Sequence, residues 1–325
     1  MPEPITDGGV ELVEVTRSGF VECVHRGSVI ALDAEAGVVL KAGEPGRPCY
    51  PRSALKPLQA VAMVRAGLVL PPPDLVLAAA SHSGEHAHVR RIRDLLIRNG
   101  LPESALICPP ALPLGAEAAD NVLASGGGKT RVFMNCSGKH TAMLLTCVAN
   151  GWPTERYVDP EHPLQQAVRA TIEDLAAEPV SAVGVDGCGA PVFAFSLIGL
   201  ARAYQRLVVA EPGSPERAVA DAMRAHPDLL GGTGRDVTRL VAGVPGLIAK
   251  DGAEGVYAAA LPGGGAVALK ISDGAARARL PVLVAALRRL GVSALVLDEL
   301  AEEPVPGGGR QVGVVRLRRG VLADD

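Results

Sequence analysis

Hydrophobic and polar positions alternate, or run in short blocks, at both ends of the chain. The blocks at 10–17, 21–32 and 38–42 lie between turn-forming residues and are typical of strands in an antiparallel meander. Near the other end, 246–272 contains two strand-like runs separated by the glycine-rich stretch PGGG, which predicts a β-hairpin. We therefore expect the two terminal regions to share one sheet.

The middle of the chain has helical periodicity. Apolar residues three or four positions apart predict helices over 54–67, 85–99, 139–150, 162–177, 193–207 and 214–226. A short apolar run at 181–187 ends in a glycine-rich turn, and another helix is expected at 275–290. Strands at both ends with helices between them indicate an α+β fold.

We interpret residues 8–325 as a single domain. Its sheet is expected to come from the two ends, about 8–45 and about 240–320. Its helical part is expected over about 53–235.

Composition excludes several classes of protein. Hydrophobic residues make up 48% of the chain and charged residues 21%, which allows a sizeable core. The net charge of −3 argues against a nucleic-acid partner. No apolar run is long enough for a membrane helix, and the N-terminus lacks the apolar segment of a signal peptide. The six cysteines are too sparse for a disulfide scaffold, so a reducing cytoplasm is expected.

Two short motifs resemble known sites but lack essential features. The stretch GGGKT at 126–130 has Leu123 where a phosphate-binding loop needs glycine, so a turn is expected. The stretch HSGEH at 82–86 has the spelling of an inverted zinc-peptidase motif. Its internal glycine is unfavourable within a helix, so a loop or a helix start is expected instead.

The stretch RSALKP at 52–57 suggests catalytic chemistry. Pro57 is tolerated only in the first turn of a helix, so a helix should begin near Ser53, which is expected to be its N-cap. Ser53 and Lys56 then share a helix face. A neutral lysine amine can accept the proton of a serine hydroxyl. The alternative is a plain cap with a surface lysine.

Four further polar clusters lie at predicted element boundaries: SHSGE (81–85), NCSGKH (135–140), DGCGAP (186–191) and KDGAEG (250–255). Together with RSALKP, in this order, they resemble the bacterial asparaginase II family, the class similar to the inducible rhizobial asparaginases. The resemblance covers roughly residues 10–275. It implies a fold similar to serine β-lactamases and penicillin-binding proteins, and hydrolysis of the side-chain amide of L-asparagine to aspartate and ammonia.

The resemblance implies two Ser–Lys pairs, Ser53 with Lys56 and Ser81 with Lys250. One serine would form a β-aspartyl ester that water then hydrolyses. We favour Ser53 as the nucleophile, with Ser81 relaying protons. Two neighbouring ammonium groups repel each other, so at least one lysine should be neutral. Lys270 is a rival for Lys250 that fits the family pattern less well.

The resemblance also implies a zinc ion bound by Cys136, Lys139 and Cys188. The alternatives are a disulfide between Cys136 and Cys188, or two inert thiols. Thiolates are good zinc ligands, whereas lysine must lose its proton to bind.

The substrate carries one carboxylate and one ammonium, so its site needs a group of each sign. Arg52 suits the carboxylate and Asp186 the ammonium. Asn135 and His140 are expected to orient the amide.

Two other functions remain open at this stage. The chain is alternatively a related serine amidohydrolase acting on glutamine or a peptide-like amide, or a zinc-binding relative without catalysis. A homodimer is expected from the family alone. Neither nucleic acid nor a membrane is expected as a partner.

Overall fold

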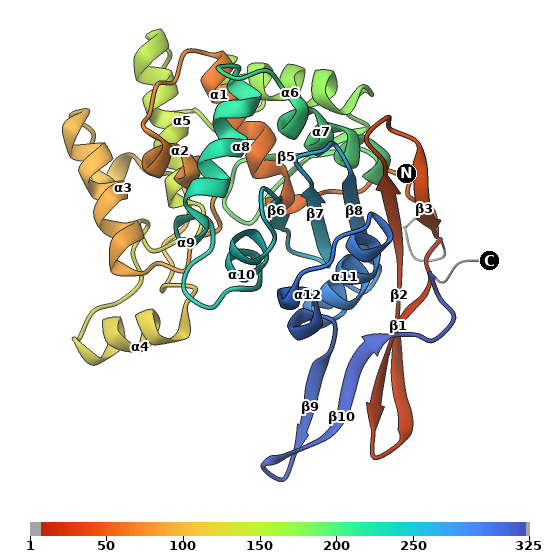
Figure 1. The fold of residues 1–325 in the computed structure, drawn as a ribbon. Coiled ribbons are helices and arrows are strands. Elements are labelled where there is room, and N and C mark those ends of the chain that lie inside the picture. Colours follow the sequence, from red (N-terminus) through yellow and green to blue (C-terminus); the bar gives the residue numbers. More distant parts are fainter. Residues whose placement is uncertain (1–7, 323–325) are drawn as a thin grey trace.

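The computed structural model describes residues 8–322. Residues 1–7 and 323–325 lie outside the described residues; they include the start of the segment predicted to lack a signal peptide and the end of the predicted domain. The described chain combines helices with an antiparallel sheet (Figure 1), which confirms the predicted mixed class. That residues 8–325 form a single domain stays a prediction.

The large sheet has eight strands in the order β6-β7-β8-β2-β1-β10-β9, with β3 paired to β2. Strands from the two chain ends pair antiparallel at two places, β2 with β8 and β1 with β10. The prediction that both ends share one sheet is therefore confirmed. The strands are β1 (Val10–Arg17), β2 (Phe20–Leu32), β3 (Val38–Ala42), β6 (Ile248–Asp251), β7 (Val256–Ala260), β8 (Ala266–Ile271), β9 (Glu303–Gly307) and β10 (Arg310–Leu317). A separate hairpin joins β4 (Ala182–Val185) to β5 (Pro191–Ala194).

Most helices follow β3 in the sequence and gather beside one end of the sheet (Figure 1). They are α1 (Lys56–Arg65), α2 (Pro72–Ala79), α3 (His86–Arg98), α4 (Ala116–Ala124), α5 (Ser137–Asn150), α6 (Pro163–Ala176), α7 (Leu197–Val209), α8 (Pro215–Ala225), α9 (Pro227–Leu230) and α10 (Asp236–Gly243). Two more, α11 (Arg279–Arg289) and α12 (Leu295–Leu300), lie between β8 and β9 in the sequence. None of the helices formed by residues 8–322 is both long and apolar enough to cross a membrane.

The core lies where the helices cover the sheet. Strands β6 and β7 are buried at every position, which requires cover on both faces because successive side chains point to opposite sides. Helices α7 and α11 both pack against β7 and β8. The many alanines in these strands let the helices approach closely. Lys250 lies in the buried strand β6 and therefore belongs to this core.

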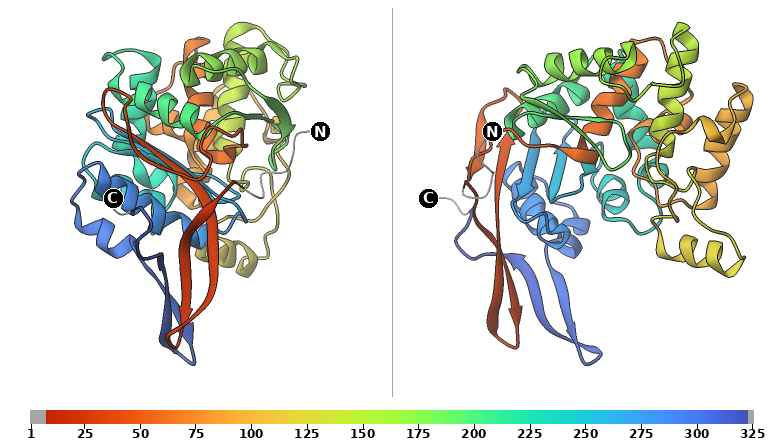
Figure 2. Two further views of the ribbon diagram at one scale, coloured as in Figure 1. Left: turned by 90° about the vertical axis from the view of Figure 1, so that its right-hand side faces the viewer. Right: turned by 180° about the vertical axis from the view of Figure 1, so that it is seen from behind.

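The far ends of two hairpins, β1–β2 and β9–β10, extend away from the helices as an arm (Figures 1 and 2). We call these strand ends the arm. At its tip Phe20 is 74% exposed, and Val21 and Val24 on the same strand are also exposed. Exposed apolar residues in a group often mark an interaction surface.

Two predicted elements differ from the structure. The predicted two-stranded hairpin at 246–272 is a three-stranded meander, because a tight turn at Gly252–Gly255 divides the first run. Glu254 has φ +56° in that turn, a conformation that its side chain did not signal. The helix predicted from residue 193 begins at Leu197, where Ser196 caps it, and the residues before it belong to β5.

The helix predicted over 85–99 occurs as α3, which begins at His86. His82 lies before this helix, so the two histidines of HSGEH do not share a helix face. The geometry of an inverted zinc-peptidase motif is therefore absent from this stretch.

Candidate active site

The serine of RSALKP lies in a 3₁₀-helix, Arg52–Leu55, that leads into α1. Helix α1 begins at Lys56 with Pro57 in its first turn, as the missing N–H of proline requires. No side chain caps α1, so the expectation that Ser53 is its N-cap is wrong. Arg52 has φ +53°, an uncommon conformation for a residue with a side chain. Such backbone strain often occurs at functional sites.

The amine of Lys56 points into the protein and meets Ser81. Its Nζ atom lies 2.9 Å from Ser81 Oγ and 2.7 Å from the carbonyl oxygen of Ala80. Both side chains are buried. Helix α1 packs against α2, and Ser81 follows the end of α2, so this packing creates the contact. The expected pairs were Lys56 with Ser53 and Ser81 with Lys250, whereas the hydrogen bond joins Lys56 to Ser81.

Ser53 differs from Ser81 in its surroundings. Its side chain is only partly buried, and no residue between 8 and 322 forms a hydrogen bond with its hydroxyl. Ser53 therefore has a free and accessible hydroxyl, while the hydroxyl of Ser81 is enclosed.

The backbone around Ser81 is held on two sides. The N–H groups of Ser81 and Ser83 donate to the carbonyls of Leu230 and Gly231, and that of His82 donates to Asn135. The imidazole of His82 contacts Ser137 Oγ at 2.9 Å. Burial lowers the pKa of His82 well below its usual value, so this histidine is neutral. These bonds fix the segment that carries Ser81.

Lys250 is completely buried and surrounded by charges. Its Nζ atom donates to the carbonyl oxygen of Asp251 at 2.8 Å and also contacts the Asp251 carboxylate. Burial lowers the pKa of Lys250 to about 8; Asp251 opposes this shift, whereas Lys56 and Arg235 add to it. Lys250 is therefore the lysine of this region that can lose its proton near neutral pH.

Lys270 lies elsewhere on the sheet. Its Nζ atom donates to the carbonyls of Glu254 and Ile271, at 2.6 and 2.9 Å. Lys56 influences the pKa of Lys250 but not that of Lys270. Lys250 contacts Asp251, and Asp251 binds Arg235, which lies against Ser81. This geometry favours Lys250 over its rival as the second lysine.

The three expected zinc ligands lie together. Lys139 Nζ is 3.3 Å from Cys188 Sγ. An interaction with Cys188 is the largest cause that raises the pKa of the Cys136 thiol, so the two thiols are neighbours. Both cysteines are free, so the alternative of a disulfide is not observed. The hydrogen bond from Cys136 and the charge of Lys139 hold the pKa of Cys188 far below its usual value, which makes it a thiolate.

Two other expected residues border this thiol cluster. His140 contacts the Tyr157 hydroxyl at 2.7 Å through Nδ1, while its buried Nε2 has no hydrogen-bond partner among the described residues. Asn135 Oδ1 accepts a hydrogen bond of 3.0 Å from Cys136 Sγ. Asn135 is therefore bonded to Cys136 and His140 to Tyr157, and neither side chain is hydrogen-bonded to Ser53 or Ser81 among the described residues.

Arg52 and Asp186 bind each other. Arg52 Nε lies 2.7 Å from Asp186 Oδ1, and Arg52 Nη1 lies 3.7 Å from Glu254 Oε1. The other oxygen of Asp186 is 3.9 Å from Cys188 Sγ. This ion pair connects the turn that contains Ser53 to the thiol cluster. All the residues that the sequence predicted for the site belong to the Ser–Lys residues, to the thiol cluster with its two neighbours, or to this ion pair.

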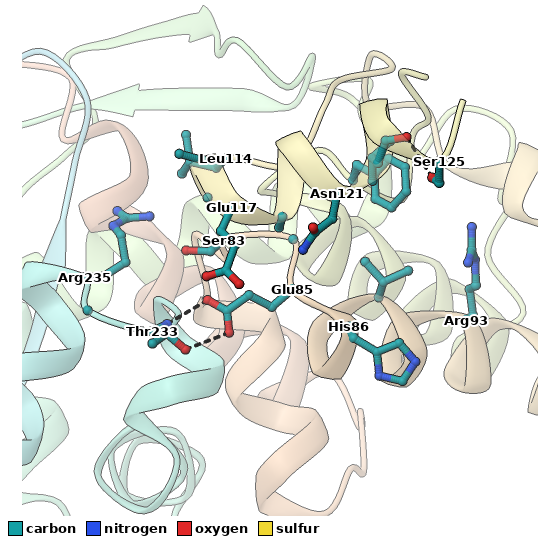
Figure 3. A pocket seen from close by; sticks show the side chains of 18 residues that line it. Ser83, Glu85, His86, Arg93, Leu114, Glu117, Asn121, Ser125, Thr233 and Arg235 are labelled. Atoms are coloured by element: carbon teal, nitrogen blue, oxygen red, sulfur yellow. Dashed lines mark hydrogen bonds between the residues drawn. The ribbon is translucent and has the colours of Figure 1, made fainter. Parts of the chain in front are cut away.

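A pocket of about 800 Å³ is lined in part by Ser83, two residues after Ser81. Figure 3 shows the side chains that line it. Its lining includes Ser83, Glu85, Glu117 and Arg235. Glu85 accepts hydrogen bonds from the N–H and hydroxyl of Thr233, at 2.7 and 3.0 Å. None of the predicted site residues lines this pocket, but Arg235 Nη1 lies 3.4 Å from the carbonyl oxygen of Ser81. The pocket is therefore a neighbour of the Ser–Lys group and not its centre.

Sequence reasoning missed three residues of the site: Asp251, Arg235 and Tyr157. Asp251 follows Lys250 directly, so the KDG sequence contained a usable signal. Nothing in the local sequence marks Arg235 or Tyr157, because each reaches the site through tertiary packing.

Comparison with known proteins gives one informative match. The family model described as L-asparaginase II matches residues 13–317. No curated protein matches the chain. Among solved structures, the chain is similar to EstCE1, a hydrolase with promiscuous acyltransferase activity, at 10% sequence identity and a TM-score of 0.36. The match covers 82% of this chain and 88% of EstCE1. A likeness this weak supports no conclusion about fold or function.

Proposed function

Since the chain belongs to the L-asparaginase II family, we propose that it hydrolyses the side-chain amide of L-asparagine to L-aspartate and ammonia by Ser–Lys catalysis. The observation that carries this proposal is the buried Lys56–Ser81 hydrogen bond beside a second buried lysine, Lys250. The Ser81 hydroxyl is hydrogen-bonded to one buried amine, Lys56, and burial lowers the pKa of the other, Lys250. A neutral amine can activate a serine without a histidine base.

In the proposed first step, Ser53 Oγ bonds to the amide carbon of the substrate, and its proton passes to a neutral lysine amine. The free, partly exposed hydroxyl of Ser53 supports its choice as nucleophile over the enclosed Ser81. The carbon–nitrogen bond then breaks, and the nitrogen takes the proton and leaves as ammonia. The product is a β-aspartyl ester on Ser53.

In the second step, a water molecule attacks the ester carbon and gives its proton to the same amine. The ester bond breaks, Ser53 Oγ regains a proton, and aspartate leaves. Ser81 and Lys56 are hydrogen-bonded, so they provide a path for these protons. Lys250 is the amine whose burial makes it a suitable acceptor.

The Arg52–Asp186 ion pair supports binding of a zwitterionic amino acid. One member offers a guanidinium to the α-carboxylate and the other a carboxylate to the α-ammonium. The α-carboxylate of the substrate can take the place of the Asp186 carboxylate beside Arg52. Its α-ammonium can take the place of the Arg52 guanidinium beside Asp186. Asn135 and His140 are proposed to orient the amide, and the unpartnered His140 Nε2 supports this role.

We propose that zinc binds at Cys136, Lys139 and Cys188. In residues 8–322 no three His, Cys, Asp or Glu side chains gather as metal ligands, so such a site depends on Lys139. The donor set fits, because the Lys139 amine lies 3.3 Å from Cys188 Sγ, the Cys136 thiol interacts with Cys188, and Cys188 is a thiolate. Burial lowers the pKa of Lys139, but the charges of the Cys188 thiolate and of Asp186 raise it by more, so zinc binding must displace the proton of Lys139. A bound zinc ion would polarise nearby carboxylate or carbonyl groups as a Lewis acid.

The remaining proposals concern fold, assembly and compartment. An S-x-x-K sequence that runs from a 3₁₀-helix into the start of α1, beside an antiparallel sheet, supports a fold like that of serine β-lactamases. The exposed Phe20 on the arm supports a homodimer. Six free cysteines support a reducing, cytoplasmic location.

The direct test is ammonia release from L-asparagine, with L-glutamine as the competing substrate. We expect asparagine to be hydrolysed far faster. Preferential hydrolysis of glutamine would favour the alternative amidohydrolase, and no release from either would refute the proposed activity. Repeating the assay after treatment with a chelator measures what zinc contributes.

A further inference from the structure

The two carboxylate oxygens of Asp251 contact two different cations, Lys250 and Arg235. One oxygen contacts the Lys250 amine, and the other lies 2.9 Å from Arg235 Nη2. Arg235 also reaches the carbonyl oxygen of Ser81 with Nη1, at 3.4 Å. Arg235 therefore contacts both Asp251, which holds the Lys250 amine, and the segment that carries Ser81.

This arrangement resolves a conflict in the site. A carboxylate in contact with a lysine amine normally keeps that lysine charged. A proton acceptor must instead be able to become neutral. Because Arg235 already balances the charge of Asp251, a protonated Lys250 would be an excess positive charge next to Lys56 and Arg235.

Other ionisable groups near Lys250 do not replace Arg235. Arg279 contacts the carbonyl of Gly252 at 2.8 Å and lies 3.6 Å from Asp236. Tyr257 on β7 and Tyr204 on α7 both have pKa values raised by burial, so they are neutral. Lys56 on α1 is committed to Ser81 and Ala80. Only Arg235 and Lys250 contact the Asp251 carboxylate among the described residues.

We propose that Arg235 is a positioning residue of the active site: by occupying one oxygen of Asp251, it lets Asp251 hold the Lys250 amine in place without fixing it in the charged form. This inference rests on the proposed role of Lys250 as proton acceptor. It assigns a function to two residues, Arg235 and Asp251, that lie outside the predicted Ser–Lys pairs.

The physical consequence is a pair of opposite pH effects. Without the charge of Arg235, Asp251 acts on Lys250 alone and raises the pKa of Lys250. Without the charge of Asp251, Arg235 and Lys56 act unopposed and lower it. Both directions agree with the signs of these charges at Lys250 in the intact protein.

The experiment compares Arg235→Gln and Asp251→Asn with the wild type, measuring kcat/KM for asparagine across the pH range. We expect Arg235→Gln to move the acidic limb upward by about one pH unit, and Asp251→Asn to move it downward by a similar amount. Arg235→Lys keeps the charge and should restore the wild-type limb. Shifts in the same direction, or an unmoved limb in both active variants, would overturn the proposal.

A second measurement does not depend on turnover. The chain has six lysines, so carbon-13 labelling of lysine gives a simple spectrum in which Lys250→Met identifies the Lys250 signal. The pKa of this signal should rise in Arg235→Gln and fall in Asp251→Asn. If the wild type fails to hydrolyse asparagine but these titrations shift as expected, the proposed function fails and the charge arrangement stands. If hydrolysis occurs and the Lys250 titration is unchanged in both variants, the inference about Arg235 fails.

Discussion

The Nζ atom of Lys56 lies 2.9 Å from the Oγ atom of Ser81, although the two residues are 25 positions apart. The contact places a buried amine at the end of α2, within the electrostatic reach of Lys250. It also links the RSALKP stretch to the SHSGE stretch.

Replacement of Lys56 by methionine should remove this proton path while keeping an apolar chain of similar length. We expect kcat for asparagine to fall about 100-fold or more, the range typical of a lost general acid–base group. Lys270→Met is the matched control, because the described hydrogen bonds of Lys270 go to the carbonyls of Glu254 and Ile271 and not to either serine. Equal losses in both variants would show that the effect is not specific to the site.

The two serines should differ in what they contribute to stability. Ser81→Ala leaves the buried Lys56 amine without one partner and should lower the free energy of unfolding by about 1–3 kcal/mol. Ser53→Ala removes a hydroxyl without partners and should change it by no more than about 0.5 kcal/mol. Urea denaturation measures both values. A larger loss of unfolding free energy for Ser53→Ala than for Ser81→Ala would contradict the view that only Ser81 is enclosed and hydrogen-bonded.

Arg52→Lys should weaken substrate binding. Lysine keeps the positive charge but cannot present the planar fork of a guanidinium to a carboxylate. We expect KM for asparagine to rise about tenfold, which corresponds to the loss of one charge-assisted hydrogen bond. Steady-state kinetics measure this change, and an unchanged KM would remove Arg52 from the substrate site.

Metal content should depend on the thiol cluster. Purified protein, analysed by mass spectrometry of its elements, should contain zinc, and Cys136→Ser and Cys188→Ser should each lose most of it. Cys147→Ser is the control, since Cys147 is a buried free thiol on the same helix as Lys139. Zinc retained in both ligand variants, or lost equally in the control, would argue against this site.

The buried Lys250 predicts a specific dependence of stability on pH. Burial lowers its pKa in the folded protein to about 8 from 10.5, so the unfolded chain binds more protons between these values. The free energy of unfolding should therefore rise with pH across this window. Relative to Lys250→Met, the wild type should gain up to about 3 kcal/mol. Denaturation of both proteins in parallel at several pH values measures the difference, and a constant difference would contradict the shift.

Sequence patterns predicted the elements that carry strong periodicity. Helix α3 occurs within the predicted 85–99, and the strands of both termini share one sheet as expected. Helix α2 was not predicted, since its start is the proline-rich stretch at 71–73. The turn at Gly252–Gly255 was missed although Asp251-Gly252 is a turn signal, because the apolar residues on both sides of it resemble one continuous run.

The site was predictable as a set of residues but not as a set of contacts. RSALKP indicated Ser53 and Lys56, yet the direction of the Lys56 side chain depends on how α1 packs against α2. Spacing along one helix suggested a Ser53–Lys56 pair, whereas packing between helices created the bond to Ser81. No local sequence pattern indicated Arg235, because its contact with Asp251 depends on the tertiary fold.

The most direct test of the central claim is rapid acid quenching of the enzyme during turnover of L-asparagine, followed by mass spectrometry of its peptides. If Ser53 is the nucleophile, the peptide that contains Ser53 should carry an aspartyl ester, and the Ser53→Ala variant should lack it. Steady ammonia release with no ester on either Ser53 or Ser81, under conditions that trap known serine esters, would contradict Ser–Lys covalent catalysis.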